Sequence, residues 1–405
     1  MMDAMSTSSA FSNLAGLPEL LLRQPADALY PAMDQYSAGF GEAGWREALR
    51  VSNECLIPQP LTLSVRAGAI PDDGSFLPSA LAGLGLHARE LADDREVVAV
   101  VLHPCAVERL GPDGVARMLD AIAQSLRTVA HPQVDVRLDA ASQLDPARLH
   151  AAGATRLTVV DRAAAPGPQL LHAAQSAGFA SCAYLLQVPQ DSDAGFLPRL
   201  RDVLSQAPER VVLPAPHGTS LHARGDRWAG AWEFVCAAGY RPAGADHYLR
   251  GDLEPPAQRG NGERHCDLAG VPRRDRSDFI GMGPGARSQI GDVLLCMDDD
   301  IDHWRRTVAS GHPAVSRGII LSVQERQLEE VVQCIACDHA VDMATFEWRN
   351  AVSFQERFAE ALPALQPLLR RGWLKREGDV LRLQGAGCLL WRMMAQCFRS
   401  VASTC

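Results

Sequence analysis

The sequence predicts an α/β fold: a partial (β/α)6-type barrel of parallel strands, followed by an α-helical, winged-helix-like C-terminal domain. From about residue 60 to 245, short apolar runs alternate with amphipathic helical segments, and this alternation is typical of repeated βα units. The chain has 405 residues, of which 47% are hydrophobic and 21% charged, so it can bury a full core. Beyond about residue 320 the pattern changes to helix, helix, two-stranded hairpin and helix.

Six strands are expected, each an apolar run bounded by polar or turn-forming residues: Leu61–Arg66, Val97–His103, Val134–Leu138, Arg156–Val160, Cys182–Val188 and Arg210–Pro214. Helices are expected between them where apolar residues recur at helical spacing: Gly114–Val129, Asp145–Ala152, Gln169–Ala177, Ala194–Gln206 and Arg227–Ala238. Gly178 and Gly239 follow two of these helices, at the position where glycine commonly ends a helix. In such barrels the functional face is formed by the C-terminal ends of the strands.

Four regions are expected along the chain. Residues 1–55 form an N-terminal segment packed on the barrel, 56–249 the barrel, 250–320 mouth loops and a connecting segment, and 321–405 the C-terminal cap. The stretch 250–277 is polar and rich in proline and glycine, and such long loops are often functional. Helices are then expected at Asp300–Ser310, Gln324–His339, Ser353–Arg371 and Gly387–Phe398, with a hairpin over 372–384.

Charge and composition exclude several classes of protein. The net charge is −9, whereas nucleic-acid binders usually carry excess Lys and Arg, so no nucleic-acid partner is expected. The last helix, CLLWRMMAQCF, is also too apolar to read a DNA groove. The sequence contains no run of about 18 apolar residues, so no membrane-spanning helix is expected. The N-terminal residues lack a signal-peptide pattern. A cytoplasmic location is therefore expected.

The eleven cysteines are odd in number and scattered, so they do not form a disulfide framework. Cys334 and Cys337 alone have C-x-x-C spacing, and the favoured interpretation is two core-facing thiols one helical turn apart. The acidic cluster 298–302 beside His303 lacks EF-hand spacing, and helix capping is favoured over metal binding.

Two further motifs bear on a site. The run Gly281-Met-Gly283-Pro-Gly285 is neither a dinucleotide nor a phosphate-binding motif, so a tight turn packed against a neighbour is expected. His103, His217 and His247 stand at or near strand ends, and with Asp246 they would form an acid/base or ligand set at the barrel mouth.

Ordered segments across nearly the whole chain carry a resemblance. LYPAMDQYSAGFG is similar to an S-Y-P-T segment, PERVVLPAPHG to a P-[DE]-R segment leading to a histidine, and GADHYLRGDLEPPAQ to G-M-D-H-F-A. GERHCDLAGV and DFIGMGPGARSQIGD are similar to L-H-R-N-F-Q-G-Y and L-G-L-G-x-S-A-I-S-x-I-G-D. In order and spacing these segments resemble oxygen-independent coproporphyrinogen III oxidase, a radical S-adenosylmethionine family of haem biosynthesis. Val98–His103 is likewise similar to the family's second strand. The pocket candidates that all these segments carry are Tyr30, His103, His217, Asp246, His247, Gly281 and Gly283.

The positions that the resemblance assigns to the family's cofactors differ in this chain. The family's C-x3-C-x2-C motif, which holds a [4Fe–4S] cluster, should follow the first strand, but no cysteine occurs between Cys55 and Cys105. Its glycine run falls on 105–109, an acidic residue on Ala183, a tyrosine on Ser64 and its N-F-Q-G on 267–270. Thiolates are the usual ligands of such clusters, and carboxylates are poor substitutes.

Three hypotheses follow from the sequence. The leading one is a cluster-free pseudoenzyme that has lost the [4Fe–4S] cluster and S-adenosylmethionine but binds haem, another porphyrin, the intact oxidase or another haem-pathway protein. The second is an active coproporphyrinogen III oxidase, which decarboxylates its substrate oxidatively to protoporphyrinogen IX, with a rearranged ligand set that draws on Cys55 and Cys105. The third is a protein-interaction adaptor acting through the C-terminal cap.

Overall fold

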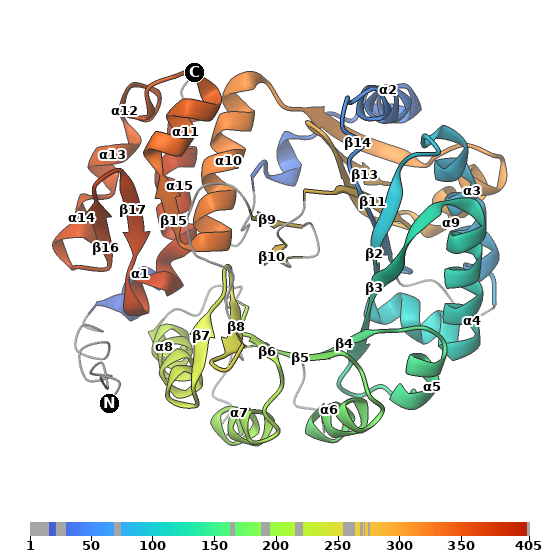
Figure 1. Ribbon diagram of the computed structural model, residues 1–405, viewed down its shortest axis with the longest axis horizontal. Coiled ribbons are helices and arrows are strands. Elements are labelled where there is room, and N and C mark those ends of the chain that lie inside the picture. The colour runs from blue at the N-terminus through green and yellow to red at the C-terminus, as the bar shows by residue number, and fades with distance from the viewer. Residues whose placement is uncertain are drawn as a thin grey trace.

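The computed structural model describes residues 16–21, 30–68, 74–162, 167–187, 195–214, 222–253, 264–267, 270, 272–273 and 276–402. One curved sheet of twelve strands dominates the described part, in the order β14-β13-β12-β11-β1-β2-β3-β4-β5-β6-β8-β7. Figure 1 shows this sheet curving around the centre of the molecule, with helices on its outer side.

The six predicted parallel strands are confirmed. They are β1 (Leu61–Val65), β2 (Glu96–Leu102), β3 (Arg127–Asp139), β4 (Arg156–Asp161), β5 (Ser181–Leu186) and β6 (Arg210–Val212). Each pairs in parallel with the next. The fold is therefore the predicted α/β class with an open barrel of parallel strands.

Side chains alternate between the two faces of these strands, as the pleat requires. Outward-facing residues such as Leu63, Val136 and Tyr184 belong to the hydrophobic core against the helices. The intervening residues face the inside of the curve, which we call the lumen, and several of them are polar. Arg137, Thr158, Ala183 and Arg210 occupy one row of the lumen, because the strand register aligns Arg137 with Thr158, Thr158 with Ala183, and Ala183 with Arg210.

The helices around the barrel are α3 (Phe76–Glu90), α4 (Pro104–Ser125), α5 (Pro146–Ala151), α6 (Gly167–Ser176), α7 (Phe196–Ser205) and α8 (His222–Ala237). Helix α3 was not predicted, and the helix predicted at Gly114–Val129 begins after the start of α4 and runs into β3. The Pro112 break had hidden the first turns of α4, where Gly111 has a φ of 58°. The N-terminal segment adds α1 (Leu17–Leu21), a short 3-10 helix (Met33–Gln35) and α2 (Gly41–Asn53).

The region expected to hold mouth loops and a connecting segment contributes much of the sheet. After β7 (Tyr240–Pro242) and β8 (His247–Arg250), a small hairpin of β9 (His265–Cys266) and β10 (Pro272–Arg273) precedes four further strands. These are β11 (Asp278–Met282), β12 (Arg287–Ile290), β13 (Val293–Met297) and β14 (Val315–Ile320). β11 pairs in parallel with β1, so residues 278–320 extend the barrel sheet on the side of its first strand. The predicted helix of this region is α9 (Ile301–Ala309).

The C-terminal domain has the predicted winged-helix-like order. Its elements are α10 (Val323–Asp338), β15 (Ala340–Asp342), α11 (Met343–Asn350), α12 (Phe354–Arg357), α13 (Ala361–Ala364), α14 (Gln366–Arg370), β16 (Leu374–Glu377), β17 (Val380–Leu383), a 3-10 helix (Gly385–Leu390) and α15 (Trp391–Ala402). The single helix expected over Ser353–Arg371 is wrong, because Pro363 and Pro367 divide it into three short helices. No helix among the described residues is long and apolar enough to cross a membrane.

Candidate functional site

A cavity of about 190 Å³ opens on the lumen between β3–β8 and α15. Its walls include the row Arg137, Thr158, Ala183 and Arg210. They also include His247, the first residue of β8, the preceding Asp246, and Trp391 and Arg392 from α15. The C-terminal domain contributes one wall of this cavity through Trp391 and Arg392 of α15, and Figure 1 shows the lower end of α10 close to β8. Two of the predicted site residues, Asp246 and His247, therefore share one cavity.

Asp246 is occupied by an ion pair within the protein. Its carboxylate accepts two hydrogen bonds from the Arg392 guanidinium, at 2.7 and 2.5 Å, and a third from the Trp391 indole at 3.2 Å. The Arg392 guanidinium also lies 4.2 Å from the centre of the Trp391 ring, within the range of a cation–π contact. Both ionic side chains are buried, so Asp246 joins the barrel to α15 and is not available as a proton acceptor.

His247 is a neutral, buried imidazole. Burial and the nearby Arg210 lower its pKa to about 3, so the ring is uncharged at neutral pH. Its Nε2 lies 2.7 Å from the carbonyl oxygen of Gly270, and because a carbonyl only accepts, Nε2 carries the proton. Nδ1 is then an acceptor, and it has no hydrogen-bond partner among the described residues.

Two arginines of the lumen row were missed by the sequence analysis. Arg210 is 8% exposed, and burial lowers its pKa to about 10, so it stays charged at neutral pH. Arg137 lies 3.5 Å from the Asp135 carboxylate on the same strand. An arginine within an otherwise apolar strand was the available signal, as in the segment VDVRLD, since such a side chain is rarely buried without a partner.

His103 lies at the other side of the lumen, directly after β2. Its Nε2 is 3.1 Å from the hydroxyl oxygen of Ser64, and its backbone N–H donates to Val65. Burial, together with the positive charges of Arg137, Arg66, Arg287 and Arg162, lowers the pKa of His103 well below its usual value. The C-terminal ends of β1–β4 therefore form an electropositive region, although the whole chain carries a net charge of −9.

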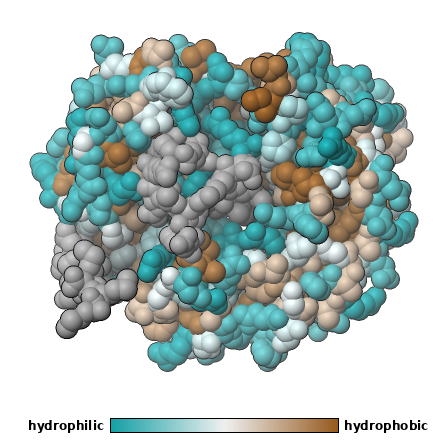
Figure 2. Space-filling model, viewed as in Figure 1, coloured by the Kyte–Doolittle hydropathy of each residue, from teal (hydrophilic) through white to brown (hydrophobic). Residues whose placement is uncertain are grey.

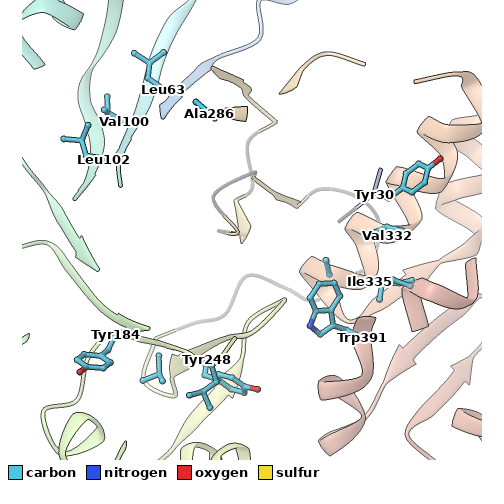
Figure 3. Close-up of a cluster of buried hydrophobic side chains, with 14 of the residues drawn as sticks. Tyr30, Leu63, Val100, Leu102, Tyr184, Tyr248, Ala286, Val332, Ile335 and Trp391 are labelled. Atoms are coloured by element: carbon cyan, nitrogen blue, oxygen red, sulfur yellow. The ribbon is translucent and has the colours of Figure 1, made fainter. Parts of the chain in front are cut away.

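Tyr30, Gly281 and Gly283 lie outside this cavity. Tyr30 is buried against the C-terminal domain, with Arg399 5.9 Å from its ring centre, and Figure 3 shows it beside Val332 of α10. Gly281 and Gly283 instead allow close backbone packing. A Cβ on Gly281 would lie 2.2 Å from the Arg287 carbonyl oxygen. Gly283, with a φ of +107°, would place one 1.8 Å from the Arg66 carbonyl oxygen. His217 lies outside the described residues.

The smaller expectations for thiols and acids agree with the structure. Cys334 and Cys337 are both buried in α10, as core-facing thiols. Asp300 caps α9 by accepting a hydrogen bond from the backbone N–H of His303 at 2.9 Å, and the Asp298 carboxylate contacts the His303 ring at 2.6 Å. Among the residues that the structure describes, no group of three or more His, Cys, Asp or Glu side chains is placed to hold a metal ion.

The residues present do not fit a [4Fe–4S] cluster at the end of β1. The chain has no cysteine between Cys55 and Cys105, and β1 is followed by the accessible guanidinium of Arg66. Cys55 follows α2 and lines a groove with Asp278, which pairs with Leu61 at the start of β1. Cys105 begins α4 after the end of β2. Since β1 is five residues long, or about 16 Å, these two thiols cannot bind one cluster.

Comparisons with known proteins place this geometry in context. Residues 321–390 match the family model described as HemN C-terminal domain. Oxygen-independent coproporphyrinogen III oxidase from Pseudomonas aeruginosa is 27% identical over 166 residues, and that from Escherichia coli is 28% identical over 165 residues. Each match covers 41% of this chain and 36% of the relative, so it spans about a third of the length of these curated relatives.

A solved structure extends the likeness to the fold of most of the chain. Coproporphyrinogen III oxidase (HemN) from Escherichia coli, a radical SAM enzyme, superposes with a TM-score of 0.79 at 22% sequence identity. The superposition covers 93% of this chain and 97% of that one. The resemblance expected from the sequence is therefore confirmed: the chain is similar to oxygen-independent coproporphyrinogen III oxidases in sequence over 41% of its length, it is similar to one of them in fold, and its residues 321–390 match the HemN C-terminal domain model.

Proposed function

We propose that this chain binds a carboxylate-bearing tetrapyrrole in the lumen of its barrel without a [4Fe–4S] cluster, as a pseudoenzyme related to coproporphyrinogen III oxidase. The name of its relatives specifies a tetrapyrrole substrate, and coproporphyrinogen III carries four propionate groups. The observation that carries the proposal is the charge of the lumen. Arg66 directly follows β1, the strand after which the resemblance would place the family's three thiolates, and Arg287 and Arg162 are close enough to lower its pKa.

The arrangement of these groups supports carboxylate recognition. Arg66 has no ion pair among the described residues, and partial burial and the neighbouring Arg287 lower its pKa. Arg210 faces the cavity from the opposite part of the sheet. Because planar guanidinium groups bind carboxylates through paired hydrogen bonds, arginines on both sides of a lumen match a ligand with several carboxylate arms.

A spectroscopic titration tests this proposal. Coproporphyrin III, the stable oxidised form of the porphyrinogen, should bind with a shift of its Soret band and a midpoint that weakens as salt is raised. A porphyrin with four cationic N-methylpyridyl groups has similar size and opposite charge, and it should not bind. Equal binding of the two porphyrins, or binding of neither, would refute the proposal.

A partner-binding role is the second candidate, and one residue favours it. Trp348 on α11 is 83% exposed, whereas the other described tryptophans are buried, and exposed aromatic residues are enriched at protein interfaces. Figure 2 shows apolar residues scattered among hydrophilic ones on the face displayed. If the C-terminal domain binds an intact oxidase, Trp348→Ala should weaken co-sedimentation, and an unchanged binding curve would exclude this surface.

A further inference from the structure

The cavity beside α15 carries an excess of positive charge. Its lining includes three cations, Arg137, Arg210 and Arg392, and one carboxylate, Asp246. Arg392 neutralises Asp246 through the two hydrogen bonds described above, and Asp135 lies close to Arg137. Among the residues that the structure describes, these pairs leave the charge of Arg210 without a direct counter-ion.

Burying the Arg210 guanidinium costs desolvation free energy, and no described carboxylate pairs with it to offset that cost. Its Nε has no hydrogen-bond partner, and no carboxylate forms an ion pair with it in the described part of the chain. The nearest charges include the repelling Arg156 as well as Asp135 and Glu209. A buried ion is normally paired and hydrogen-bonded, so the unpaired guanidinium facing a cavity indicates a missing anion.

His247 adds a second unmet requirement on the same wall. It lies opposite Val212 in the antiparallel pairing of β6 and β8, and both Val212 and His247 line the cavity. Nδ1 of His247 is a buried acceptor without a donor among the described residues. A ligand that meets both requirements has an anionic group for Arg210 and an N–H or O–H group for Nδ1.

We infer that this cavity is a subsite for one carboxylate arm of a ligand, bound by Arg210, with a neighbouring N–H or O–H group donating to His247. Its volume of about 190 Å³ is below the ~300 Å³ typical of pockets for whole drug-sized ligands. The subsite therefore takes an arm, and the body of the ligand stays outside it. This inference deepens the proposed function, on which the identity of the ligand as a tetrapyrrole rests; the subsite itself rests on Arg210 and His247.

Small carboxylates test the subsite directly. Butyrate should bind the full chain, detected by calorimetry or by chemical-shift changes, whereas the uncharged butyramide should not. Arg210→Met should weaken butyrate binding about 10- to 100-fold, the range expected for a charge-assisted hydrogen bond. Arg156→Met is the matched control, because Arg156 bonds Ser181 and Gln133 on the same sheet without lining the cavity. 4-Hydroxybutyrate should bind more tightly than butyrate, and His247→Phe should remove that difference.

Stability without ligand gives an independent readout. Since Arg210 is an unpaired buried charge, Arg210→Met should leave the melting temperature unchanged or raise it. Arg95→Met should lower it, because Arg95 is a buried arginine paired with Asp278 at 2.7 Å. Unchanged butyrate binding by Arg210→Met, or a loss of stability equal to that of Arg95→Met, would overturn the inference.

Different results would refute the proposed tetrapyrrole binding and the carboxylate subsite. Arg210-dependent butyrate binding by a chain that ignores coproporphyrin III would support the subsite and refute the proposed function. Equal binding of coproporphyrin III by wild type and Arg210→Met would support the function and refute the subsite. If Arg210→Met does not fold, nuclear Overhauser contacts between butyrate and the methyl groups of Leu185 and Val212, which both line the cavity, decide the question on the unmodified chain. Their absence under saturating butyrate would overturn the subsite.

Discussion

Replacing Asp246 with alanine should strongly destabilise the protein, because Asp246 holds the barrel to the C-terminal domain. The Asp246 and Arg392 side chains are 10% and 6% exposed, respectively. The substitution would leave the Arg392 guanidinium buried without its counter-ion, at a cost of about 3–5 kcal/mol. The Trp391 indole would also lose its acceptor, which adds about 1 kcal/mol.

Urea denaturation followed by tryptophan fluorescence and by circular dichroism would measure this loss. Asp113→Ala is the matched control, because Asp113 pairs with Arg148 at 3.2 Å on the surface, where the side chains are 91% and 61% exposed. Exposed pairs contribute about 0–1 kcal/mol, so this control should unfold almost as the wild type does.

A double variant separates the charge from the packing. Asp246→Leu with Arg392→Leu removes both ions, and it should be less destabilising than Asp246→Ala alone, because apolar replacement of a buried pair is often neutral. A loss below about 1 kcal/mol for Asp246→Ala would refute this reasoning. So would a double variant that is less stable than the single one.

Three further predictions concern a histidine, the free thiols and a glycine. Burial lowers the pKa of His87 to about 4, so between pH 6.5 and 4 only the unfolded state gains this proton, and the free energy of unfolding should fall by up to about 3 kcal/mol. In urea titrations at pH 7 and 4.5, His87→Phe should lose less free energy of unfolding between the two pH values than the wild type does. An equal loss in both proteins would contradict the role of His87. Cys55 and Cys105 are exposed, and mass spectrometry should find them alkylated before any buried thiol of the described region. Gly283→Ala should lower the melting temperature far more than Gly291→Ala, because both glycines have positive φ but the space around Gly291 is open; equal shifts would contradict the packing argument.

The barrel could be predicted from the sequence because each of its strands and helices is indicated by the residues of its own segment. β1–β6 and most surrounding helices follow from hydrophobic periodicity within single segments. The strands β11–β14 were missed because their formation depends on the pairing of β1 with β11, across more than two hundred residues. Although β13 is a wholly apolar run, VLLCM, neither the partner of a strand nor its place in a sheet can be deduced from so short a segment.

The candidate site was predicted in part, for the same physical reason. From the sequence, Asp246 and His247 were expected at the barrel mouth, and the structure places both in one cavity. It did not reveal that Arg392, which is 146 positions from Asp246 along the chain, neutralises that carboxylate. Arg210 was overlooked because an arginine at the start of a strand normally reaches solvent, and only the folded sheet turns it into the lumen.

Anaerobic reconstitution with iron and sulfide tests the central claim most directly. Since the chain has no cysteine between Cys55 and Cys105, we expect the desalted protein to retain no stoichiometric iron or sulfide and to show no cluster signal in ultraviolet–visible or electron-resonance spectra. A stoichiometric [4Fe–4S] cluster that dithionite reduces would contradict the proposed cluster-free function.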